Sequence, residues 1–480
     1  MSSLEHWPVV VLGAGPVGLA AAAQLIERHI PFVVLEAAPM VGANLIDYGH
    51  VRLFSPWRYN IDHAVARLLT PTGWQAPKAE DMPLAGEVVA RVLAPFAQLE
   101  PVSSALHLGT RVVSVTREGF DKVKSLGREK APFVVRAVRA GQTIEFKARA
   151  VIDATGTWNS PNPLGAGGIP ALGESSAAGQ VFYGIPDVLG VHRSRYAGRK
   201  TLVVGAGHSA ANALLSLAEL AKEVPETQLV WSVRSPELPR VFGGGDADAL
   251  PARGALGVAL RELRDSGRLV FQSGFRITEI RSEAGRLCVV GVGDGGVAHR
   301  IDGVDEIICA TGQRPNLALT SELRVSLHPW LECVKALGPL IDPNLHSCGT
   351  VRPHGHRELS HPEPGWYTVG VKSYGRAPTF LMATGFEQAR SVVAAIAGDV
   401  EAADRVELDL PETGVCSVGG SAPEGSAGGS PAPCCGPGPV KVVEVAVPGS
   451  GCCASPAVAR RAGAGESFAP PTQSRSACCG

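Results

Sequence analysis

Six cysteines near the C-terminal end of this 480-residue chain stand in adjacent pairs, and paired thiolates bind soft metal ions or exchange electrons. The pairs are Cys434 with Cys435, Cys452 with Cys453, and Cys478 with Cys479. Such sulfur donors suit As(III), Hg(II) or Cu(I), whereas structural zinc is less favoured because the pairs lie far apart. We therefore take these cysteines as candidate ligands of a thiophilic metal(loid). Incidental cysteines in a low-complexity tail are the alternative.

Two glycine-rich turns carry a second kind of chemistry, the binding of a dinucleotide. They read Gly13-Ala14-Gly15-Pro16-Val17-Gly18 and Gly205-Ala206-Gly207-His208-Ser209-Ala210. In such a turn the first glycine permits the bend, the second lets a pyrophosphate approach the backbone, and the third lets the helix pack on the strand. The N–H groups at the helix N-terminus then hold the phosphates. A purely structural glycine turn is the alternative in each case.

The residues that follow the second predicted strand of each unit differ in charge. Glu36 lies 23 residues beyond Gly13, where a carboxylate can accept hydrogen bonds from ribose hydroxyls. The second unit has Arg234 instead, and a cation there suits a 2′-phosphate, so NADPH is favoured over NADH. A solvated surface arginine is the alternative reading of Arg234.

The elements that must position these turns form an imperfect internal repeat. Apolar runs predict a strand, the turn, a helix and a second strand at Val9–Leu12, Val17–Arg28 and Phe32–Leu35, and again at Thr201–Val204, a helix to about Ala221, and Gln228–Val233. Each unit continues in alternating, β-rich segments. Each ends in a buried strand and an Ala-Thr-Gly turn, at 154–156 and 310–312. The sequence therefore predicts an α/β protein with two Rossmann-like dinucleotide-binding domains.

Composition excludes several classes of function. The formal net charge is −1 and the pI is about 6.9, which gives no electrostatic footprint for nucleic acid or an anionic membrane. The uncharged run Trp7–Ile26 is long enough to cross a membrane, but the first glycine turn interrupts it. The N-terminal residues lack the basic region of a secretory signal. We therefore expect a cytoplasmic protein without a membrane span.

The segment 411–480 is rich in Gly, Pro, Ser and Ala. It cannot bury enough apolar surface to offset the entropy of ordering it, so we predict a disordered tail that carries the cysteine pairs. The folded body ends near residue 410.

These motifs resemble the two-dinucleotide-binding-domain flavoproteins over the whole folded body. The resemblance implies an FAD domain split into residues 1–175 and 305–410, with an NADPH domain inserted at 176–304. FAD and NADPH are the implied cofactors. It further implies that Tyr367–Gly370 forms a late strand beside the flavin, and that the helix after Ala383-Thr384-Gly385 points its N-terminus at the flavin ring. Val113, Gly156, Thr384 and Gly385 join the first turn and Glu36 as implied FAD-binding residues.

Within that family, the disulfide reductases need a cysteine pair beside the flavin. Residues 1–287 contain no cysteine, and Cys288 and Cys309 lie on separate predicted strands. The usual internal redox disulfide is therefore excluded, and these two residues read as buried structural thiols.

The class B flavin monooxygenases carry an aromatic, glycine and histidine fingerprint before the second glycine turn. This chain has Phe182-Tyr183-Gly184 and, with four extra residues between the halves, His192–Tyr196. The Gly207-His208-Ser209 segment also resembles the Gly-x-Ser turn of these enzymes. A domain linker with chance aromatic residues is the alternative.

The resemblance also nominates two catalytic residues in the segment 51–60. Trp57 would stack near the flavin, and Asn60 would hydrogen-bond oxygen bound there. The alternatives are core packing for Trp57 and a turn role for Asn60.

A narrower resemblance, to flavoproteins encoded with arsenic-resistance genes, rests on the Pro411–Ser417 junction and the cysteine-pair tail. Mercuric reductases also end in adjacent cysteines but need the internal redox pair. A further group, His346, Cys348, His354, His356 and His361, is irregularly spaced and reads as a surface loop rather than a metal site.

Together these features predict an FAD-dependent NADPH oxidoreductase of the monooxygenase type that acts on a small molecule and is linked to arsenic or another thiophilic toxicant. The alternatives are an NADPH-dependent reductase that uses the tail thiols, and a metalloid-binding or redox-sensing flavoprotein. No motif specifies the substrate, the acid–base residues or the oligomeric state.

Overall fold

The computed structural model describes residues 4–236, 242, 250–345, 351, 353–378 and 380–408. The three cysteine pairs of the predicted tail lie outside the described residues, as do His346 and Cys348. The predictions made for them are therefore carried forward as predictions.

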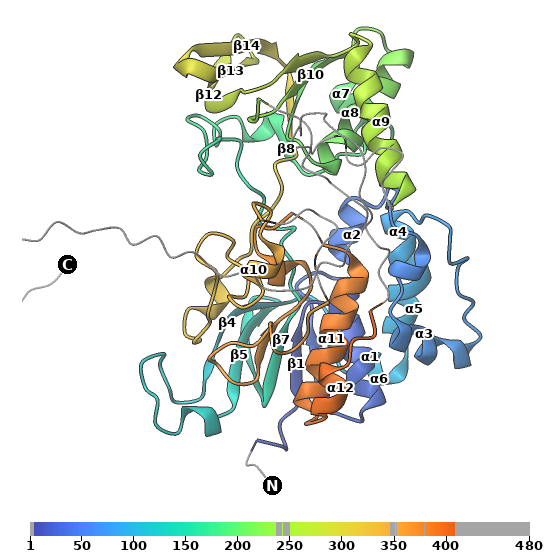
Figure 1. Cartoon of the computed structure of the whole chain (residues 1–480), viewed down its shortest axis with the longest axis vertical. Coiled ribbons are helices and arrows are strands. Elements are labelled where there is room, and N and C mark those ends of the chain that lie inside the picture. The colour runs from blue at the N-terminus through green and yellow to red at the C-terminus, as the bar shows by residue number, and fades with distance from the viewer. Residues whose placement is uncertain are drawn as a thin grey trace, which may run out of the picture. The chain divides into compact units, whose positions relative to one another are not determined.

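A parallel five-stranded sheet forms the centre of the first dinucleotide-binding unit (Figure 1). Its strands run in the order β16-β7-β1-β2-β3. The bounds are β1 Val9–Leu12, β2 Phe32–Leu35, β3 Leu106–His107, β7 Ala150–Asp153 and β16 Trp366–Thr368. All residues of β1 and β7 are buried, as expected for strands covered on both faces. The sheet thus draws its edge strand from a segment more than 200 residues beyond β7.

Helices cover this sheet, and two of them come from opposite ends of the chain. The helix α1, Pro16–Glu27, packs against α11, Met382–Ile396, and Figure 1 shows the blue and orange helices side by side. Alanines dominate the buried face of α1, which lets the two helices approach closely. The second part of the split domain is therefore joined to the first through its core.

A second parallel sheet has the order β11-β10-β9-β15-β8. The bounds are β8 Val181–Tyr183, β9 Lys200–Val204, β10 Gln228–Ser232, β11 Val270–Gln272 and β15 Glu306–Cys309. The helices α8, His208–Glu223, and α9, Pro251–Asp265, belong to this unit and pack together. The strand β15 pairs with both β8 and β9, so the second sheet extends beyond the domain boundary expected at residues 304 and 305. We therefore propose a boundary after Cys309.

Each unit also carries a small antiparallel sheet, as the alternating segments predict. In the first unit these strands are β4 Thr110–Arg117, β5 Phe133–Arg139 and β6 Gln142–Ala148. In the second they are β12 Arg276–Glu283, β13 Arg286–Val292 and β14 Ala298–Val304. The internal repeat therefore includes both the parallel and the antiparallel parts, and the predicted α/β fold of two Rossmann-like units is confirmed.

Short helices make up most of the remaining structure. They are α2 Ala43–Asp47, α3 His63–Leu69, α4 Ala85–Val88, α5 Ala94–Ala97, α6 Glu100–Ser103, α7 Arg193–Tyr196, α10 Gly338–Ile341 and α12 Val400–Asp404. Two 3-10 helices, Trp57–Tyr59 and Gly370–Tyr374, lie in segments that the sequence singled out.

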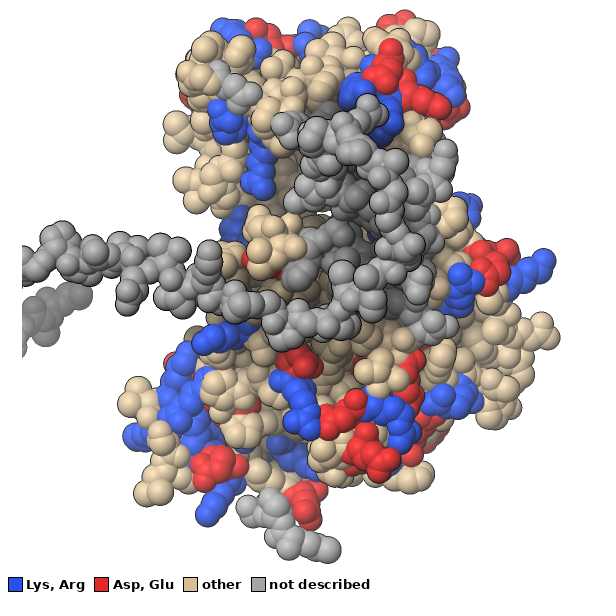
Figure 2. All heavy atoms as spheres, viewed as in Figure 1, with Lys and Arg blue, Asp and Glu red and all other residues tan. Residues whose placement is uncertain are grey.

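The uncharged run Trp7–Ile26 is divided between β1, the first glycine turn and α1. Among the described residues, no helix combines the length and the apolar character needed to span a bilayer. On the face shown in Figure 2, basic and acidic side chains are intermingled over the described surface.

A buried ion cluster ties the late segment of the split domain to the early one. Glu363 accepts hydrogen bonds from Arg117 Nε at 2.8 Å and from an Arg128 terminal nitrogen at 2.8 Å. All three side chains are buried, so the charges are almost fully removed from water. Breaking such a pair by removing one partner costs about 3–5 kcal/mol, because the other charge is left buried and unpaired.

Candidate functional site

The first glycine turn has the geometry that dinucleotide binding requires. Gly13 adopts a φ of +96°, and a Cβ on it would lie 2.8 Å from the carbonyl oxygen of Ala154. A Cβ on Gly18 would lie 1.9 Å from the carbonyl oxygen of Gly13, so only glycine lets α1 pack this close to the turn. A Cβ on Gly15 would meet no atom within 4 Å. The middle glycine therefore faces open space, where a pyrophosphate can approach.

The N-terminus of α1 is free of any side-chain cap. Gly15 is the N-cap residue and Pro16 occupies the start of the helix, so the first N–H groups point into the open space beside Gly15. Glu36 follows β2, and its carboxylate accepts hydrogen bonds from Ala14 N at 2.7 Å and Ala38 N at 2.8 Å. A phosphate cradle and a carboxylate thus lie side by side, which fits the ADP half of FAD.

Small residues bring the late segment against the same turn. Gly370 adopts a φ of +70°, and its absent Cβ would lie 3.4 Å from Val17. A Cβ on Gly385 would lie 2.4 Å from Val17 Cγ2, so the first turn of α11 contacts α1 directly. Gly156 faces Val371 in the same way, at 3.7 Å. Gly370 and the implied FAD residue Gly385 therefore pack against Val17, whereas Gly156 lies beside Val371.

The structure corrects the expected start of the helix at the implied FAD site and places Val113 in a β-bulge. The helix was expected after Ala383-Thr384-Gly385, but α11 begins at Met382, so Thr384 lies buried inside its first turn. Val113 is 42% exposed and occupies a β-bulge between Val112 and Ser114. A bulged residue is left out of the regular ladder, so its backbone is available to a ligand.

The second glycine turn keeps the first two glycines of the pattern and replaces the third with alanine. Gly205 has a φ of +139°, and a Cβ on it would lie 2.2 Å from the Ala310 carbonyl oxygen. Gly207 faces open space and is the N-cap of α8, which again has no side-chain cap. The third position is Ala210, which is fully buried. The indole of Trp231 donates to Gly205 O at 2.8 Å and fixes the bend.

Other predicted NADPH residues lie around this turn. His208 starts α8, and its ring lies 5.0 Å from that of Phe54, in the segment 51–60 of the first unit. Ser209 lines a pocket together with Trp158, Tyr183, Cys309 and Gln313. Arg234 is exposed two residues beyond the end of β10, where a 2′-phosphate can reach it.

Asn162, six residues beyond the first Ala-Thr-Gly turn, bonds the second one. Asn162 donates from its backbone to Gly312 O at 2.9 Å and from its side chain to Thr311 O at 3.0 Å. Thr311 Oγ1 donates back to Asn162 O at 3.0 Å, and Arg314 Nε donates to Asn162 Oδ1 at 2.9 Å. Sequence reasoning did not single out Asn162 or Arg314. The only signal was their place within six residues of an Ala-Thr-Gly turn.

The halves of the monooxygenase-like fingerprint meet in the structure. The rings of Phe182 and His192 pack edge to face with centroids 5.0 Å apart, and the Arg195 guanidinium lies 5.8 Å from the Phe182 ring. Tyr196 is fully buried. The four extra residues are therefore accommodated in the loop between the halves.

The two candidate catalytic residues are engaged within the fold. Asn60 is 1% exposed, and its amide donates to Ser55 O at 2.7 Å and Pro56 O at 2.9 Å, while its oxygen accepts from Ser55 Oγ. Trp57 is 2% exposed and belongs to the core of the first unit. This geometry favours the turn role for Asn60, because its amide is bonded within the segment 55–60, and core packing for Trp57, because its side chain is buried in the core.

The described cysteines, Cys288, Cys309 and Cys333, are all free and buried. Burial raises the pKa of the Cys309 thiol to about 11, and burial with a hydrogen bond to Asp302 raises that of Cys288 to about 11. Such thiols are protonated at neutral pH and are poor nucleophiles.

The sequence analysis did not identify one group of side chains whose atoms could bind a metal ion. Sulfur and carboxylate atoms of Glu283, Cys288 and Asp302 lie within 4.8 Å of one another. Arg300 already pairs with both carboxylates, at 3.4 Å and 2.5 Å, which accounts for the cluster without an ion.

The described members of the histidine group have separate partners. His354 contacts Gln388 at 2.8 Å, and His356 pairs with Asp404 at 2.9 Å. His361 Nδ1 accepts from Ser326 N at 3.1 Å. Each of these three histidines therefore has its own partner, and His354 is buried rather than on the surface.

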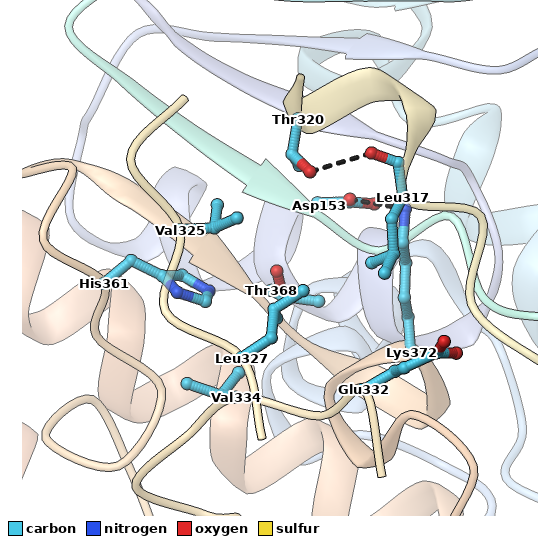
Figure 3. Close-up of a pocket in the computed structure, with 10 residues that line it drawn as sticks. All are labelled: Asp153, Leu317, Thr320, Val325, Leu327, Glu332, Val334, His361, Thr368 and Lys372. Carbon is cyan, nitrogen blue, oxygen red and sulfur yellow. Dashed lines mark hydrogen bonds and ion pairs between the residues drawn. The ribbon is translucent and has the colours of Figure 1, made fainter. Parts of the chain in front are cut away.

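A small pocket opens beside the carboxyl ends of β7 and β16 (Figure 3). Its lining is Asp153, Leu317, Thr320, Val325, Leu327, Glu332, Val334, His361, Thr368 and Lys372. Burial lowers the pKa of His361 to about 4, so its imidazole is neutral. Lys372 was not singled out from the sequence, although it is the only charged residue between Trp366 and Gly375.

No protein-family model matches this chain. Two curated proteins are similar over part of it. A ferredoxin–NADP reductase of Thermus thermophilus is 26% identical over 221 residues, which are 46% of this chain and 52% of that protein. A probable indole-3-pyruvate monooxygenase of Arabidopsis thaliana is 28% identical over 216 residues, which are 44% of each chain. The chain spans about half the length of these relatives.

Solved structures share the fold over most of the chain. The bacillithiol disulfide reductase Bdr of Bacillus cereus has a TM-score of 0.60 at 18% identity, covering 82% of this chain and 99% of that one. The cadaverine monooxygenase DfoA of Erwinia amylovora, solved with FAD, has a TM-score of 0.56 at 15% identity, covering 87% and 99%. At such identities the likeness establishes the fold alone, that of flavoprotein oxidoreductases with two dinucleotide-binding units.

Proposed function

We propose that this protein is an FAD-dependent NADPH oxidoreductase. The observation that carries the proposal is the pair of glycine turns. In each, the middle glycine faces open space at an uncapped helix N-terminus. The two sites are distinguished by the residue after the second strand of each unit, which is the acidic Glu36 in the first and the basic Arg234 in the second. The similarity to a ferredoxin–NADP reductase and to flavin-dependent enzymes supports the same assignment.

In this proposal, bound FAD would supply the redox chemistry, the acceptance of a hydride from NADPH. The backbone N–H groups beside Gly15 hold the FAD pyrophosphate, and Glu36 accepts from the adenosine ribose. The first turn of α11 packs against Val17, and the positive end of this helix would stabilise negative charge on a reduced flavin ring. The turn at Gly207 holds the NADPH pyrophosphate, and Arg234 pairs with its 2′-phosphate.

Within this class we favour a monooxygenase, which uses NADPH, a proton and O2 to place one oxygen atom in a small substrate and release the other as water. The described cysteines support this choice, because they are buried, unpaired and protonated. The assembled fingerprint around Phe182 and His192 and the similarity to a probable indole-3-pyruvate monooxygenase point the same way.

A second candidate is an NADPH-dependent reductase, which the ferredoxin–NADP reductase relative favours. In that case the paired cysteines 434/435, 452/453 and 478/479 take electrons from the flavin or present a bound soft ion to it. The link to arsenic or another thiophilic ion, in an enzyme or in a metalloid-binding flavoprotein, rests on these cysteines and the 411–417 junction alone. A cytoplasmic location belongs to the same proposal.

The deciding experiment is rapid mixing of the full-length protein. The flavoprotein is reduced with NADPH without oxygen and then mixed with oxygenated buffer, with and without arsenite. A long-lived spectrum distinct from both oxidised and reduced flavin supports the monooxygenase. Direct return to the oxidised spectrum, at a rate changed by arsenite, supports the reductase.

A variant with all six paired cysteines changed to serine provides the control. Its behaviour with oxygen should match the wild type if the protein is a monooxygenase, whereas reduction that depends on the tail should disappear. A purified protein that binds neither FAD nor NADPH contradicts both candidates.

A further inference from the structure

Lys372 is an almost fully buried cation in the late part of the split domain. It is 3% exposed, and its ammonium lies 2.7 Å from Asp153 Oδ2, whose side chain is fully buried. The same ammonium donates to Thr155 Oγ1 at 2.9 Å. Figure 3 shows the Lys372 side chain extending toward Asp153 at the end of β7.

The other carboxylate oxygen of Asp153 completes the network. Asp153 Oδ1 accepts from Thr155 Oγ1 at 2.7 Å and from Thr155 N at 3.1 Å. Lysine, aspartate and threonine therefore satisfy one another through four hydrogen bonds. Their combined effect is to hold the backbone of Ala154-Thr155-Gly156 in one conformation.

This Ala-Thr-Gly turn is the surface on which the first glycine turn rests. Ala154 N donates to Leu12 O at 2.9 Å, and the Ala154 carbonyl oxygen lies only 2.8 Å from where a Cβ of Gly13 would be. On its other side Gly156 faces Val371, the residue before Lys372. A movement of residues 154–156 would therefore displace Gly13 and the phosphate cradle at Gly15.

Stability alone does not explain why an ion pair occupies this buried position. Removing two charges from water costs several kcal/mol per ion, and apolar residues of similar volume often serve stability equally well. A buried, hydrogen-bonded ion pair instead fixes the orientation of the groups it joins, because each donor and acceptor has one defined partner. The network therefore suits a role in positioning.

We propose that Lys372 is a positioning residue for FAD, which acts through Asp153 and Thr155 to hold the Ala-Thr-Gly turn against the first glycine turn. The inference rests on the proposed FAD site. It makes the affinity of the phosphate cradle at Gly15 dependent on Lys372, which lies 219 positions beyond Asp153 in the chain.

The test compares variants of the full-length apoprotein titrated with FAD, with flavin fluorescence as the readout and urea unfolding in parallel. Lys372→Met leaves Asp153 buried without its partner, so both stability and affinity fall. The double variant Lys372→Met with Asp153→Asn removes both charges. We expect it to recover stability but to bind FAD about tenfold more weakly than the wild type, which corresponds to about 1.4 kcal/mol.

Thr155 offers a matched pair of neutral changes that should not threaten folding. Thr155→Val removes the hydroxyl at constant volume and should weaken FAD binding several-fold, whereas Thr155→Ser keeps the hydroxyl and should bind as the wild type does. The visible circular dichroism of bound flavin should change in the same order, which a general loss of stability would not produce.

The Glu363 cluster serves as the structural control, because it is equally buried in the same unit but bonds no atom of residues 153–156. Glu363→Gln should lower the urea midpoint and leave the FAD affinity of the folded protein unchanged. Wild-type FAD affinity in the double variant and in Thr155→Val would overturn the proposed role of Lys372. A wild-type protein that does not bind FAD would instead overturn the proposed function.

Discussion

The two glycine turns have the same arrangement but differ in whether their third residue can carry a Cβ. Gly18, the third residue of the first turn, lies so close to Gly13 O that a Cβ would be 1.9 Å from it. Its counterpart in the second turn, Ala210, carries a Cβ within the buried core. The second bend is instead held by the indole of Trp231. Close backbone packing secures the first turn, and a side-chain hydrogen bond helps to secure the second.

The residues that follow the second strand of each unit extend this contrast. Glu36 already accepts two backbone hydrogen bonds, one of them from Ala14 inside the turn. Arg234 is exposed beyond the end of β10. The first site is thus built into the fold, whereas the second presents its charged group to a ligand. This difference suits a resident cofactor in the first site and an exchanging one in the second.

The largest expected effect comes from adding a methyl group to the first turn. Gly18→Ala places a Cβ against backbone that cannot move cheaply, so we expect the free energy of unfolding to fall by about 3 kcal/mol and FAD binding to be lost. The matched change Ala210→Gly should cost only about 1 kcal/mol, through helix propensity. Urea unfolding and FAD titration measure both. Equal effects at the two positions would contradict the contrast.

The next effect concerns pH and the first unit. The His361 imidazole has a pKa of about 4 in the folded chain, below its ordinary value of 6.5, because burial disfavours the charged form. The unfolded chain binds this proton first, so stability is full above pH 6.5 and falls as the pH drops toward 4. The loss is at most about 3 kcal/mol.

His361→Gln should remove that part of the pH dependence. The measurement is urea unfolding at several pH values between 7 and 4, with wild type and variant compared at each. An identical slope in both proteins would show that His361 does not titrate as described.

A change at the second site should affect only the pyridine nucleotide. Arg234→Ala is expected to raise the KM for NADPH about tenfold, because one charge-assisted contact is lost, and to leave the KM for NADH nearly unchanged. Arg268→Ala, at another exposed arginine of the same unit, is the control. Steady-state kinetics with both nucleotides decide the matter, and a parallel rise in both KM values would speak against a 2′-phosphate contact.

The smallest expected effect tests the Trp231 hydrogen bond. Trp231→Phe keeps an aromatic ring in the core but removes the donor to Gly205 O, so we expect a loss of about 1 kcal/mol in stability and a modest rise in the KM for NADPH. FAD affinity should not change, since the bond lies wholly within the second unit. A change in FAD affinity would indicate that the two turns are not independent.

Much of the fold could be predicted because its signals are local. The runs at Val9–Leu12 and Phe32–Leu35 are strands with those bounds, and glycine turns follow the first strand of each unit. The start of α11 was placed too late because Ala383-Thr384-Gly385 looks like a turn in sequence. In the structure these residues belong to the first turn of α11, where Gly385 packs against Val17. The pairing of β15 with β9, on which our proposed boundary after Cys309 rests, is not visible in the sequence.

Some features of the candidate site could likewise be predicted from the sequence, and others could not. The glycine turns and the charges of Glu36 and Arg234 could be recognised, because a bend, an open backbone and the charge after a strand depend on residue type and spacing. The environment of Asn60 could not, because an amide that bonds Ser55 and Pro56 has the same sequence as one that faces a ligand.

The sequence by itself determined that this chain builds two dinucleotide-binding units, since glycine conformation and apolar periodicity act over a few neighbouring residues. Only the tertiary structure decided that Lys372 meets Asp153, that Asn162 bonds the second Ala-Thr-Gly turn, and that the third turn position excludes a methyl group in one unit and accepts it in the other. Those outcomes depend on distances between atoms that lie far apart along the chain, and such distances exist only once the sheets and helices have packed.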